Sequence, residues 1–357
     1  MTAPVHTQVD RARLALDIRA WAAELGFQQA GIAQVQLAED EAWLLRWLQL
    51  GRHGEMAYMA HHGSKRSRPD ELVPGTLSVV SLRMDYLHAE AHPILELVEA
   101  PERAAISRYA LGRDYHKLMR KRLQRLASRI KAAVGDFGYR VFVDSAPVLE
   151  RALARNAGLG WIGKHTNLIH PRAGSWFFLG EIYTDLPLAA DGETIDDHCG
   201  TCTRCLEACP TGAIVAPYEV DARLCISYLT IELRGSIPEA LRPLIGNRIF
   251  GCDDCQAVCP WNRFAQPSRE ADFSPRDGLD GPPLVDLFAW SEEEWSRRTE
   301  GSPLRRAGYA GWLRNIAVAL GNGPPSAQAV AALRSRAEHP SALVREHVEW
   351  ALRRLAG

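Results

Sequence analysis

The stretch CGTCTRCLEACP at residues 199–210 decides what kind of protein this chain is. A second stretch, CDDCQAVCP, follows at residues 252–260, and Cys225 lies between the two. The first stretch has the C-x2-C-x2-C-x3-C-P spacing of bacterial ferredoxins, in which the fourth cysteine reaches across to the other of two 4Fe–4S clusters. The sequence therefore predicts a ferredoxin-like module with two clusters.

The same crossing divides the eight cysteines of the chain into two ligand sets. One predicted set is Cys199, Cys202, Cys205 and Cys259. The other is Cys209, Cys225, Cys252 and Cys255. Zinc also binds C-x2-C pairs and remains an alternative, and a spare buried thiol is the alternative interpretation of Cys225. A disulfide framework suits small secreted chains rather than one of 357 residues.

Length and composition bound the architecture. With 357 residues, 46% of them apolar and 24% charged, the chain can form two or three domains with ordinary cores. No run of about eighteen apolar residues occurs, so we expect no membrane span. The N-terminal region reads as an amphipathic helix without an export signal, its apolar side carrying Leu14, Ile18, Trp21 and Leu25. Oxygen-sensitive clusters without such a signal point to the cytoplasm.

We expect three parts along the chain. Residues 1–190 alternate helical and strand patterns and predict an α/β domain. Residues 191–265 form the cluster module, and residues 266–357 form a linker followed by helices. Within the last part, residues 308–322 and 339–357 share a pattern of small, apolar and basic residues. That pattern is compatible with HEAT-like helical repeats, or with an ordinary helical cap.

The charge is nearly balanced overall but unevenly distributed. A net charge of −1 predicts no global attraction to nucleic acid. Residues 103–131 nevertheless carry ten lysines and arginines, and residues 296–357 carry ten arginines against four glutamates. Such faces can bind phosphate groups, although charge runs on helices are more often solvated surfaces.

The clusters require an electron acceptor in the α/β part, because they transfer single electrons and do no bond chemistry of their own. That part has no G-x-G-x-x-G fingerprint of a nicotinamide or flavin cofactor. Cobalamin, held mainly through backbone and apolar contacts, would leave little motif. The cobalamin motif D-x-H-x-x-G begins at Asp114 and His116 but has Met119 in place of glycine. We therefore expect His116 to be a surface or helix-packing residue, and a bound cobalt to lack a histidine from this chain.

Asp144 is the candidate catalytic residue. It ends the strand pattern YRVFVD and precedes a predicted helix, at the edge where α/β sheets place ligands. A partly desolvated carboxyl group there would have a raised pKa and would act as a general acid. The alternative is that Asp144 or Ser145 caps the helix that starts near Pro147.

Several stretches together resemble the epoxyqueuosine reductase family, over residues 10–265. Besides the cysteine runs, they are KRSRPDELVPG at 65–75, VDSAPVLERALARNAGLGWIGKHTNLIHPRAGSWFFLGEIYTDL at 143–186, ARLCISYLTIELRG at 222–235 and IGNRIFGCDDCQAVCP at 245–260. The resemblance implies a cobalamin-binding catalytic α/β domain, two 4Fe–4S clusters and a HEAT-like C-terminal segment. It also implies the last step of queuosine biosynthesis, in which epoxyqueuosine at the wobble position of a tRNA anticodon is reduced to queuosine. Asp144 would be the proton donor.

The resemblance also implies contacts to cobalamin and to tRNA. The residues expected around the corrin, together with Asp144, are Arg66, Ser107, Leu168, Leu179, Ile182 and Ser227. A surface salt bridge is the alternative role of Arg66, and plain core packing that of the leucines. Arg248 and the two basic segments become candidate tRNA contacts. We expect a monomer that takes electrons from an unidentified low-potential donor.

Two other functions compete with this one. A cytoplasmic cobalamin-dependent reductive dehalogenase would share the clusters and the cobalt, but it would not need the basic helical tail. A simple electron carrier would need no large α/β domain with an acidic residue at a strand end.

Overall fold

The computed structural model describes residues 10–191, 194–276 and 278–357. Its largest sheet has four strands in the order β1 (Gln29–Ala33), β2 (Ser78–Asp85), β7 (Phe177–Thr184) and β4 (Tyr139–Phe142). Every neighbouring pair in this sheet is antiparallel. The first part is thus a mixed α/β domain, as expected. Its main sheet is antiparallel, however, whereas the sequence predicted Asp144 at the strand ends of an open parallel sheet.

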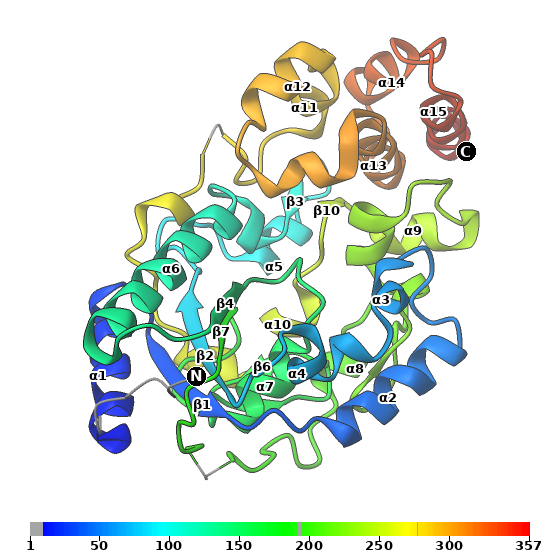
Figure 1. The fold of residues 1–357 in the computed structure, drawn as a ribbon. Helices are drawn as coiled ribbons and strands as arrows, with labels where there is room; N and C mark the ends of the chain where they lie inside the picture. Colours follow the sequence, from blue (N-terminus) through cyan, green and yellow to red (C-terminus); the bar gives the residue numbers. More distant parts are fainter. Residues whose placement is uncertain (1–9, 192–193, 277) are drawn as a thin grey trace.

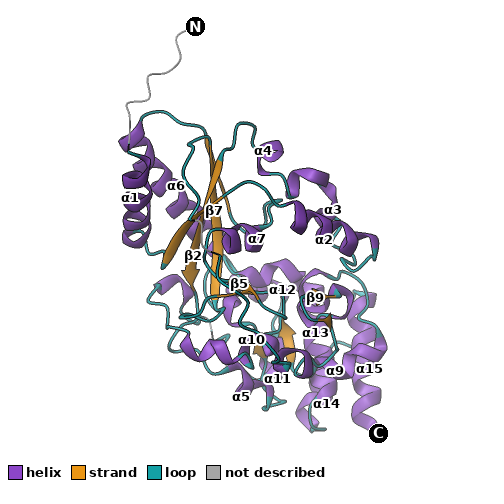
Figure 2. Cartoon of the chain, turned by 90° about the horizontal axis from the view of Figure 1, so that it is seen from below, coloured by secondary structure: helices purple, strands orange, loops and turns teal. Residues whose placement is uncertain are grey.

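Helices cover both faces of this sheet (Figures 1 and 2). On one face lie α1 (Arg11–Glu24) and α6 (Tyr115–Val134), which bury apolar side chains at helical spacing, for example Leu14, Ile18 and Leu123. The long basic helix α6 begins at Tyr115 because the Asp114 carboxylate caps it by accepting the His116 N–H. The other face packs against α7 (Glu150–Asn156).

Short elements surround the sheet. The helices among them are α2 (Ala38–Gln49), α3 (Tyr58–His61), α4 (Pro69–Leu72) and α5 (Ile94–Val98). The strands are β3 (Ala105–Ile106), β5 (Trp161–Ile162) and β6 (Leu168–Ile169). The helix α2 ends just before Gly51, whose φ of +63° suits the residue after a helix end.

The cysteine-rich part consists of short elements between loops. They are α8 (Arg204–Glu207), β8 (Ile214–Ala216), β9 (Glu219–Val220), α9 (Arg242–Ile245), β10 (Arg248–Phe250) and α10 (Asp254–Ala257). Strand β10 pairs in parallel with β3 of the first part. Just after this pair, a Cβ on Gly251 would lie 2.6 Å from the Cβ of Ser107, so the close approach requires glycine.

The C-terminal part is helical, as predicted. Its helices are α11 (Leu284–Ala289), α12 (Glu292–Arg298), α13 (Gly308–Asn322), α14 (Ala327–Arg334) and α15 (Ala342–Ala356). The central helix α13 is buried along most of its length. Its Arg314 donates to the carbonyl oxygens of Leu229, Leu233 and Gly235.

One hydrophobic core includes residues of α13, of the cysteine-rich part and of the segment around β3. The predicted division at residue 265 therefore does not separate two independent cores. Among the described residues, no helix combines the length and apolarity needed to cross a bilayer.

Candidate functional site

The four thiols of the first predicted ligand set line one small cavity. They are Cys199, Cys202, Cys205 and Cys259, and the cavity is closed by Lys164, His198 and Trp261 among others. The Lys164 ammonium group donates to the carbonyls of Gly200 and Cys202 and so fixes the loop. The structure therefore brings Cys259, from the second stretch, to the cysteines of the first.

The second set also comes together. The thiol of Cys255 interacts electrostatically with those of Cys225 and Cys209, and Cys252 packs against the same core as Cys225. Cys209 accepts the Ala213 N–H at 3.2 Å. Cys225 thus lies beside other cysteines, where a fourth ligand is required.

Burial favours the protonated form of several of these thiols. Burial raises the pKa of Cys205 to about 11, and burial also raises the pKa of Cys225, Cys252 and Cys255. A cation that binds thiolates must therefore displace these protons. Within the described ranges, no three His, Cys, Asp or Glu side chains are already placed to hold a single metal ion.

Asp144 lies in the loop between β4 and α7, beside the first turn of α6. Its carboxylate Oδ2 accepts a 2.5 Å hydrogen bond from the Tyr115 hydroxyl and lies 3.3 Å from Nε2 of His116. The other imidazole nitrogen, Nδ1, lies 2.7 Å from the carboxylate of Asp114. Asp144 has a φ of +35°, a left-handed conformation that residues other than glycine rarely adopt. Strain of this kind is typical of functional sites.

The charges at this site differ from the expectation. Burial raises the pKa of Asp144, but hydrogen bonds from His116 and Tyr115 outweigh burial and lower it below the ordinary value. Burial lowers the pKa of His116, but its bonds to Asp114 and Asp144 prevail and raise it to about 9. The predicted raised pKa of Asp144 is wrong, because two donors from α6 stabilise the carboxylate. His116 stacks on the Tyr115 ring, as the packing prediction allows, and it also bridges the carboxylates of Asp114 and Asp144.

The capping alternative for Asp144 is wrong as well. Helix α7 begins at Glu150, and its N-cap residue, Leu149, makes no side-chain capping bond. The Ser145 hydroxyl donates instead to the carbonyl of Val143. The Asp144 side chain is therefore free for the interactions described above.

Two further carboxyl groups lie behind Asp144 on the α7 face of the sheet. Glu181, in the middle of β7, is fully buried opposite Phe142 and Ser81, and neither of its oxygens has a hydrogen-bond partner among the described residues. Glu150 faces the backbone N–H of Asp144 and has a buried Oε2 that likewise has no partner there. Burial and the charge of Asp144 raise the pKa of Glu150 to about 8. Burial, with the neighbouring carboxylates, raises the pKa of Glu181 well above its ordinary value.

A half-buried tyrosine connects Asp144 with the second cysteine set. Tyr109 interacts electrostatically with Asp144 and with Asp253. Asp253 follows Cys252 directly and accepts a hydrogen bond from the Ser107 hydroxyl. The acidic site and the second cysteine set therefore lie near one aromatic ring.

The polar residues that the resemblance assigns to the corrin have partners within the protein. Arg66 is buried and donates to the carbonyls of Tyr58 and Met59 at 2.8 and 3.1 Å. It is not the surface residue of the alternative interpretation. Ser227 donates to the sulfur of Cys225, and the Ser107 hydroxyl donates a hydrogen bond to the Asp253 carboxylate.

The apolar residues assigned to the corrin are split between two cores. Leu168 and Leu179 pack on the α7 face of the sheet, whereas Ile182 is fully buried on the α1 and α6 face. Because side chains alternate along a strand, Leu179 and Ile182 point to opposite faces. This argues against side-chain contacts from both to one flat group.

Arg248, a predicted tRNA contact, is not on the surface. Its guanidinium forms a buried two-point ion pair with Asp254, with Nε at 2.7 Å, and also hydrogen-bonds Cys252. The prediction is wrong because the side chain folds back onto the loop of the second cysteine set.

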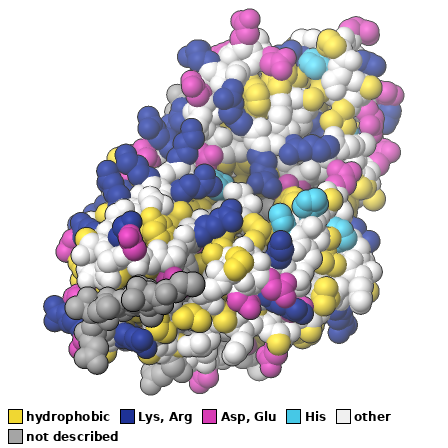
Figure 3. Space-filling view, viewed as in Figure 1, with side chains coloured by type: hydrophobic (Ala, Val, Ile, Leu, Met, Phe, Trp, Pro, Cys, Tyr) yellow, Lys and Arg dark blue, Asp and Glu magenta, His cyan; other side chains and the backbone are white. Residues whose placement is uncertain are grey.

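Basic side chains of α6 do reach the surface beside the site. Lys117, Arg120, Lys121 and Arg125 are exposed. In Figure 3, Lys and Arg side chains gather on the left of the molecule over α6 and continue toward its centre. Within the other basic segment Arg314 is buried, so only part of the predicted charge is accessible.

Two residues that the sequence did not single out also face Asp144. The Arg306 guanidinium lies over the Tyr58 ring, 5.8 Å from its centroid, and its Nε is 2.7 Å from Glu232. Both side chains interact electrostatically with Asp144. They remain accessible, with exposed fractions of 44% for Tyr58 and 39% for the Arg306 side chain. Only folding brings α3 next to the turn before α13, so no sequence signal paired them.

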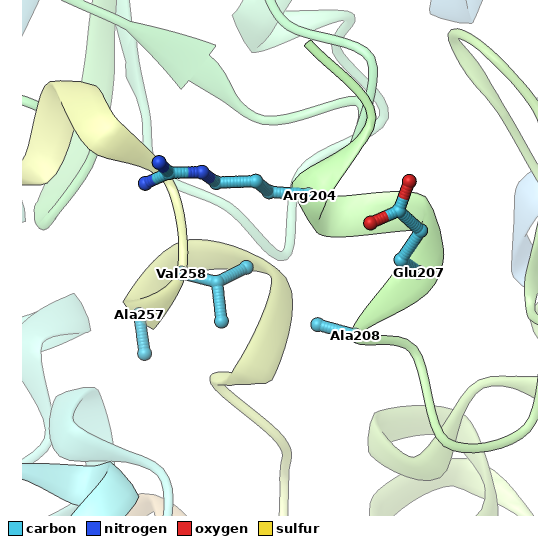
Figure 4. Close-up of a pocket in the computed structure, with 5 residues that line it drawn as sticks. All are labelled: Arg204, Glu207, Ala208, Ala257 and Val258. Carbon is cyan, nitrogen blue, oxygen red and sulfur yellow. The ribbon is translucent and has the colours of Figure 1, made fainter.

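A shallow depression marks the outer surface of the cysteine-rich part (Figure 4). It lies between α8 and α10 and is lined by Arg204, Glu207, Ala208, Ala257 and Val258. Ala208 precedes Cys209 and Val258 precedes Cys259. The depression is therefore adjacent to one ligand of each predicted cluster.

Comparisons with known proteins agree along the chain. Residues 66–145 match the family model "Epoxyqueuosine reductase QueG, DUF1730", and residues 198–262 match the "4Fe-4S double cluster binding domain". The chain is 64% identical to the epoxyqueuosine reductase of Pseudomonas aeruginosa, covering 97% of this chain and 95% of that protein. It is 55% identical to that of Escherichia coli K12, covering 96% and 90%.

Solved structures agree with these sequence relatives. The crystal structure of an epoxyqueuosine reductase with an epoxyqueuosine-modified tRNA-Tyr stem loop superposes with a TM-score of 0.88 at 29% identity, covering 98% of this chain and 92% of that one. The structure of the Bacillus subtilis enzyme with its catalytic aspartate loop swung out of the active site gives 0.86 at 29% identity, covering 97% and 91%.

Paired cysteine sets joined to a sheet domain with an acidic site define an iron–sulfur redox enzyme. Relatives of this similarity, over nearly the whole of both chains, narrow the class to one family. The chain belongs to the epoxyqueuosine reductase family.

Proposed function

We propose that this chain reduces epoxyqueuosine to queuosine at the wobble position of a tRNA anticodon. In this reaction the epoxide oxygen leaves as water and a carbon–carbon double bond forms, with two electrons and two protons consumed. The observation that carries the proposal is the Asp144 site beside two complete cysteine sets in a member of this family. A relative's structure with an epoxyqueuosine-modified stem loop supports the substrate.

The residues present fit the expected cofactors. Each cysteine set offers four thiols to one 4Fe–4S cluster. Cobalamin fits the open side of Asp144, whose side chain is 43% exposed. Because two carboxylates engage both nitrogens of His116, this imidazole is not offered to cobalt. When bound, the clusters would supply single electrons, and the cobalamin would pass them to the epoxide carbon.

Contacts of individual residues to the corrin remain part of the proposal. Arg66 and Asp144 flank Tyr58, which supports one wall of the cofactor site there. Leu168 and Leu179 lie together on the α7 face. Ser107 and Ser227 would act through the second cluster loop that they stabilise.

Asp144 would deliver a proton to the opening epoxide oxygen. In the free protein its carboxylate is ionised, and the nearby proton resides on His116. When substrate covers the exposed 43% of the Asp144 side chain, loss of water raises its pKa and draws a proton from a hydrogen-bonded neighbour. The catalytic loop that swings out in the Bacillus subtilis enzyme supports a mobile Asp144 loop, consistent with its positive φ.

The exposed basic side chains of α6 would bind the tRNA backbone. This helix starts at the residues that hold Asp144, so phosphates that follow its exposed face would lead the anticodon to the site. Four basic residues there, Lys117, Arg120, Lys121 and Arg125, are exposed. Binding that rests on such phosphate contacts weakens steeply with salt.

The Tyr58–Arg306 pair would hold the anticodon loop at the mouth of the site. Anticodon bases are unstacked when they are read by proteins, and they stack on aromatic rings and on arginine planes. The pair presents one of each, and both side chains are accessible. Arg306 belongs to the C-terminal part, so that part would take a direct share in recognition.

Electrons would enter from an unidentified low-potential donor at the depression between α8 and α10 (Figure 4). One ligand of each predicted cluster adjoins this surface.

We further propose that the protein acts in the cytoplasm as a monomer. Its cobalamin domain, cluster module and helical segment would be divided near residues 190 and 265.

Mass analysis of tRNA nucleosides tests the function. The reconstituted protein is incubated without oxygen with cobalamin, a low-potential reductant and tRNA that carries epoxyqueuosine. We expect the modified nucleoside to lose the mass of one oxygen atom. An unchanged nucleoside with a protein that holds both clusters would refute the proposal.

A further inference from the structure

Two buried N–H groups beside the first cysteine set have no role in the function proposed so far. They belong to Trp161 and His165, which lie on the hairpin formed by β5 and β6. The indole Nε1 and the imidazole Nε2 are both buried without a hydrogen-bond partner among the described residues. Buried donors in folded proteins almost always have an acceptor, so each of these two indicates an acceptor that the protein chain itself does not supply.

The turn of this hairpin is fixed against the loop of the first cysteines. Its Lys164 side chain donates to the carbonyls of Gly200 and Cys202, and the Lys164 carbonyl accepts the Tyr218 backbone N–H at 2.9 Å. Lys164 and His165 both line the cavity of the four thiols. The turn therefore holds His165 at a defined place beside this cysteine set.

The proton of the His165 ring is on the nitrogen that lacks a partner. Nδ1 accepts the Asn167 backbone N–H at 3.1 Å, which it can do only without a proton of its own. The proton of the neutral ring is then on Nε2. Because His165 is only 4% exposed and lines the cavity, its Nε2–H is a donor for an acceptor inside that cavity.

Trp161 supplies a second donor from the same hairpin, since an indole nitrogen can only donate. Burial raises the pKa of the Cys199 thiol, while the Lys164 backbone N–H and the Trp161 indole lower it, so the indole lies beside that sulfur. The Trp161 ring packs edge-on against Trp261 and His198, with centroids 5.0 and 5.1 Å away. These rings shield this side of the cavity from water, and a hydrogen bond is stronger where the local dielectric is low.

We propose that Trp161 and His165 donate hydrogen bonds to sulfur atoms of the first 4Fe–4S cluster and raise its reduction potential. Hydrogen bonds to the sulfurs are among the features that set the potential of such clusters. Reduction adds one electron from the low-potential donor and makes or breaks no bond. The added negative charge is shared by the sulfurs, so the two donors stabilise the reduced cluster more than the oxidised one. The inference rests on the proposed function, in which this cluster passes electrons on, and adds two positioning residues to it.

The test is a redox titration of the anaerobically reconstituted protein, followed by the EPR signals of its clusters. His165→Phe and Trp161→Phe each keep a ring but remove the N–H. We expect each variant to raise the ratio of oxidised to reduced first cluster about tenfold at a fixed potential, which is a midpoint lower by about 59 mV for a one-electron step. The midpoint of the second cluster should not move.

Two further variants control for the shape of the site. His165→Gln keeps an amide N–H near the position of Nε2 and should retain the wild-type midpoint. Trp295→Phe removes a buried, unpaired indole N–H from α12, in the C-terminal part. It should leave both midpoints unchanged.

Isotope labelling gives a readout that needs no variant. With nitrogen-15 in the histidine and tryptophan rings, pulsed EPR of the reduced wild-type protein should show weak coupling of the first cluster to these nitrogens. The coupling to each ring should disappear in the matching Phe variant. If a Phe variant loses its iron, the coupling in wild type decides.

The outcomes separate this inference from the proposed function. Unchanged midpoints in both Phe variants, or no nitrogen coupling in wild type, would refute the hydrogen bonds even if queuosine is formed. A wild-type protein that shows the shifts and the coupling but forms no queuosine would refute the proposed function and leave the hydrogen bonds in place.

Discussion

The imidazole Nε2 of His116 lies 3.3 Å from the carboxylate Oδ2 of Asp144, while its Nδ1 lies 2.7 Å from Asp114. One ring thus joins the N-cap of α6 to the proposed catalytic residue. Two carboxylates on one imidazole favour its charged form. The arrangement keeps a proton beside Asp144 at neutral pH.

This ion pair predicts a pH-dependent stability. Because the pKa of His116 is raised to about 9, its contribution is complete below about pH 6.5, the ordinary histidine value. It is lost as pH rises through 9. We expect His116→Gln to lower the free energy of unfolding at pH 6 by about 2 kcal/mol, and the difference from wild type to shrink by pH 10. A difference that does not change over this range, measured by denaturant unfolding, would contradict the ion pair.

The second cluster loop depends on Arg248. Replacing Arg248 by alanine leaves the buried Asp254 carboxylate without its partner, which costs about 3 kcal/mol of stability. The loop carries Cys252, so iron content should fall as well. Arg269→Ala, at an exposed arginine nearby in the sequence, is the control and should change stability by less than about 0.5 kcal/mol. Equal stability of both variants would argue against the buried pair.

The ligand role of Cys225 is tested by counting iron. Anaerobically reconstituted wild-type protein should contain about eight iron atoms, and Cys225→Ser should retain about four, in the first cluster. Serine keeps the size of the side chain, so a folding defect is not expected. Eight irons in this variant would make Cys225 the spare thiol of the alternative interpretation.

The Tyr58–Arg306 pair should set the affinity for tRNA. We expect Tyr58→Ala and Arg306→Ala each to raise KM for tRNA about tenfold, because a stacking contact to one base is lost, with a smaller change in kcat. Arg305→Ala is the matched control, since the Arg305 side chain bonds to Ser296. Anisotropy of a labelled stem loop reports binding without turnover. Equal binding by all three variants would show that neither Tyr58 nor Arg306 contacts the stem loop.

The sequence predicted much of this protein because its strongest signals are local. Cysteine spacing within short stretches predicted two ligand sets, and the structure brings Cys259 to Cys199, Cys202 and Cys205. Helical periodicity predicted the N-terminal helix that buries Leu14 and Ile18. These features depend on residues close in the chain, where spacing alone constrains geometry.

The errors came from side-chain contacts that form only when the chain folds, whether the partners are near or far in the sequence. The pKa of Asp144 depends on Tyr115 and His116, and Arg248 is neutralised by Asp254 only after the loop folds. Arg306 meets Tyr58 across most of the chain. The antiparallel sheet order was likewise hidden, since strand patterns do not reveal partners.

Asp144→Asn tests the central claim most directly. The variant keeps the shape and its contacts with Tyr115 but cannot carry a proton to the substrate. With both clusters and a corrinoid bound, it should convert epoxyqueuosine in tRNA at least ~100-fold more slowly than wild type under identical anaerobic conditions, as measured by nucleoside mass analysis. Conversion at the wild-type rate would contradict the account.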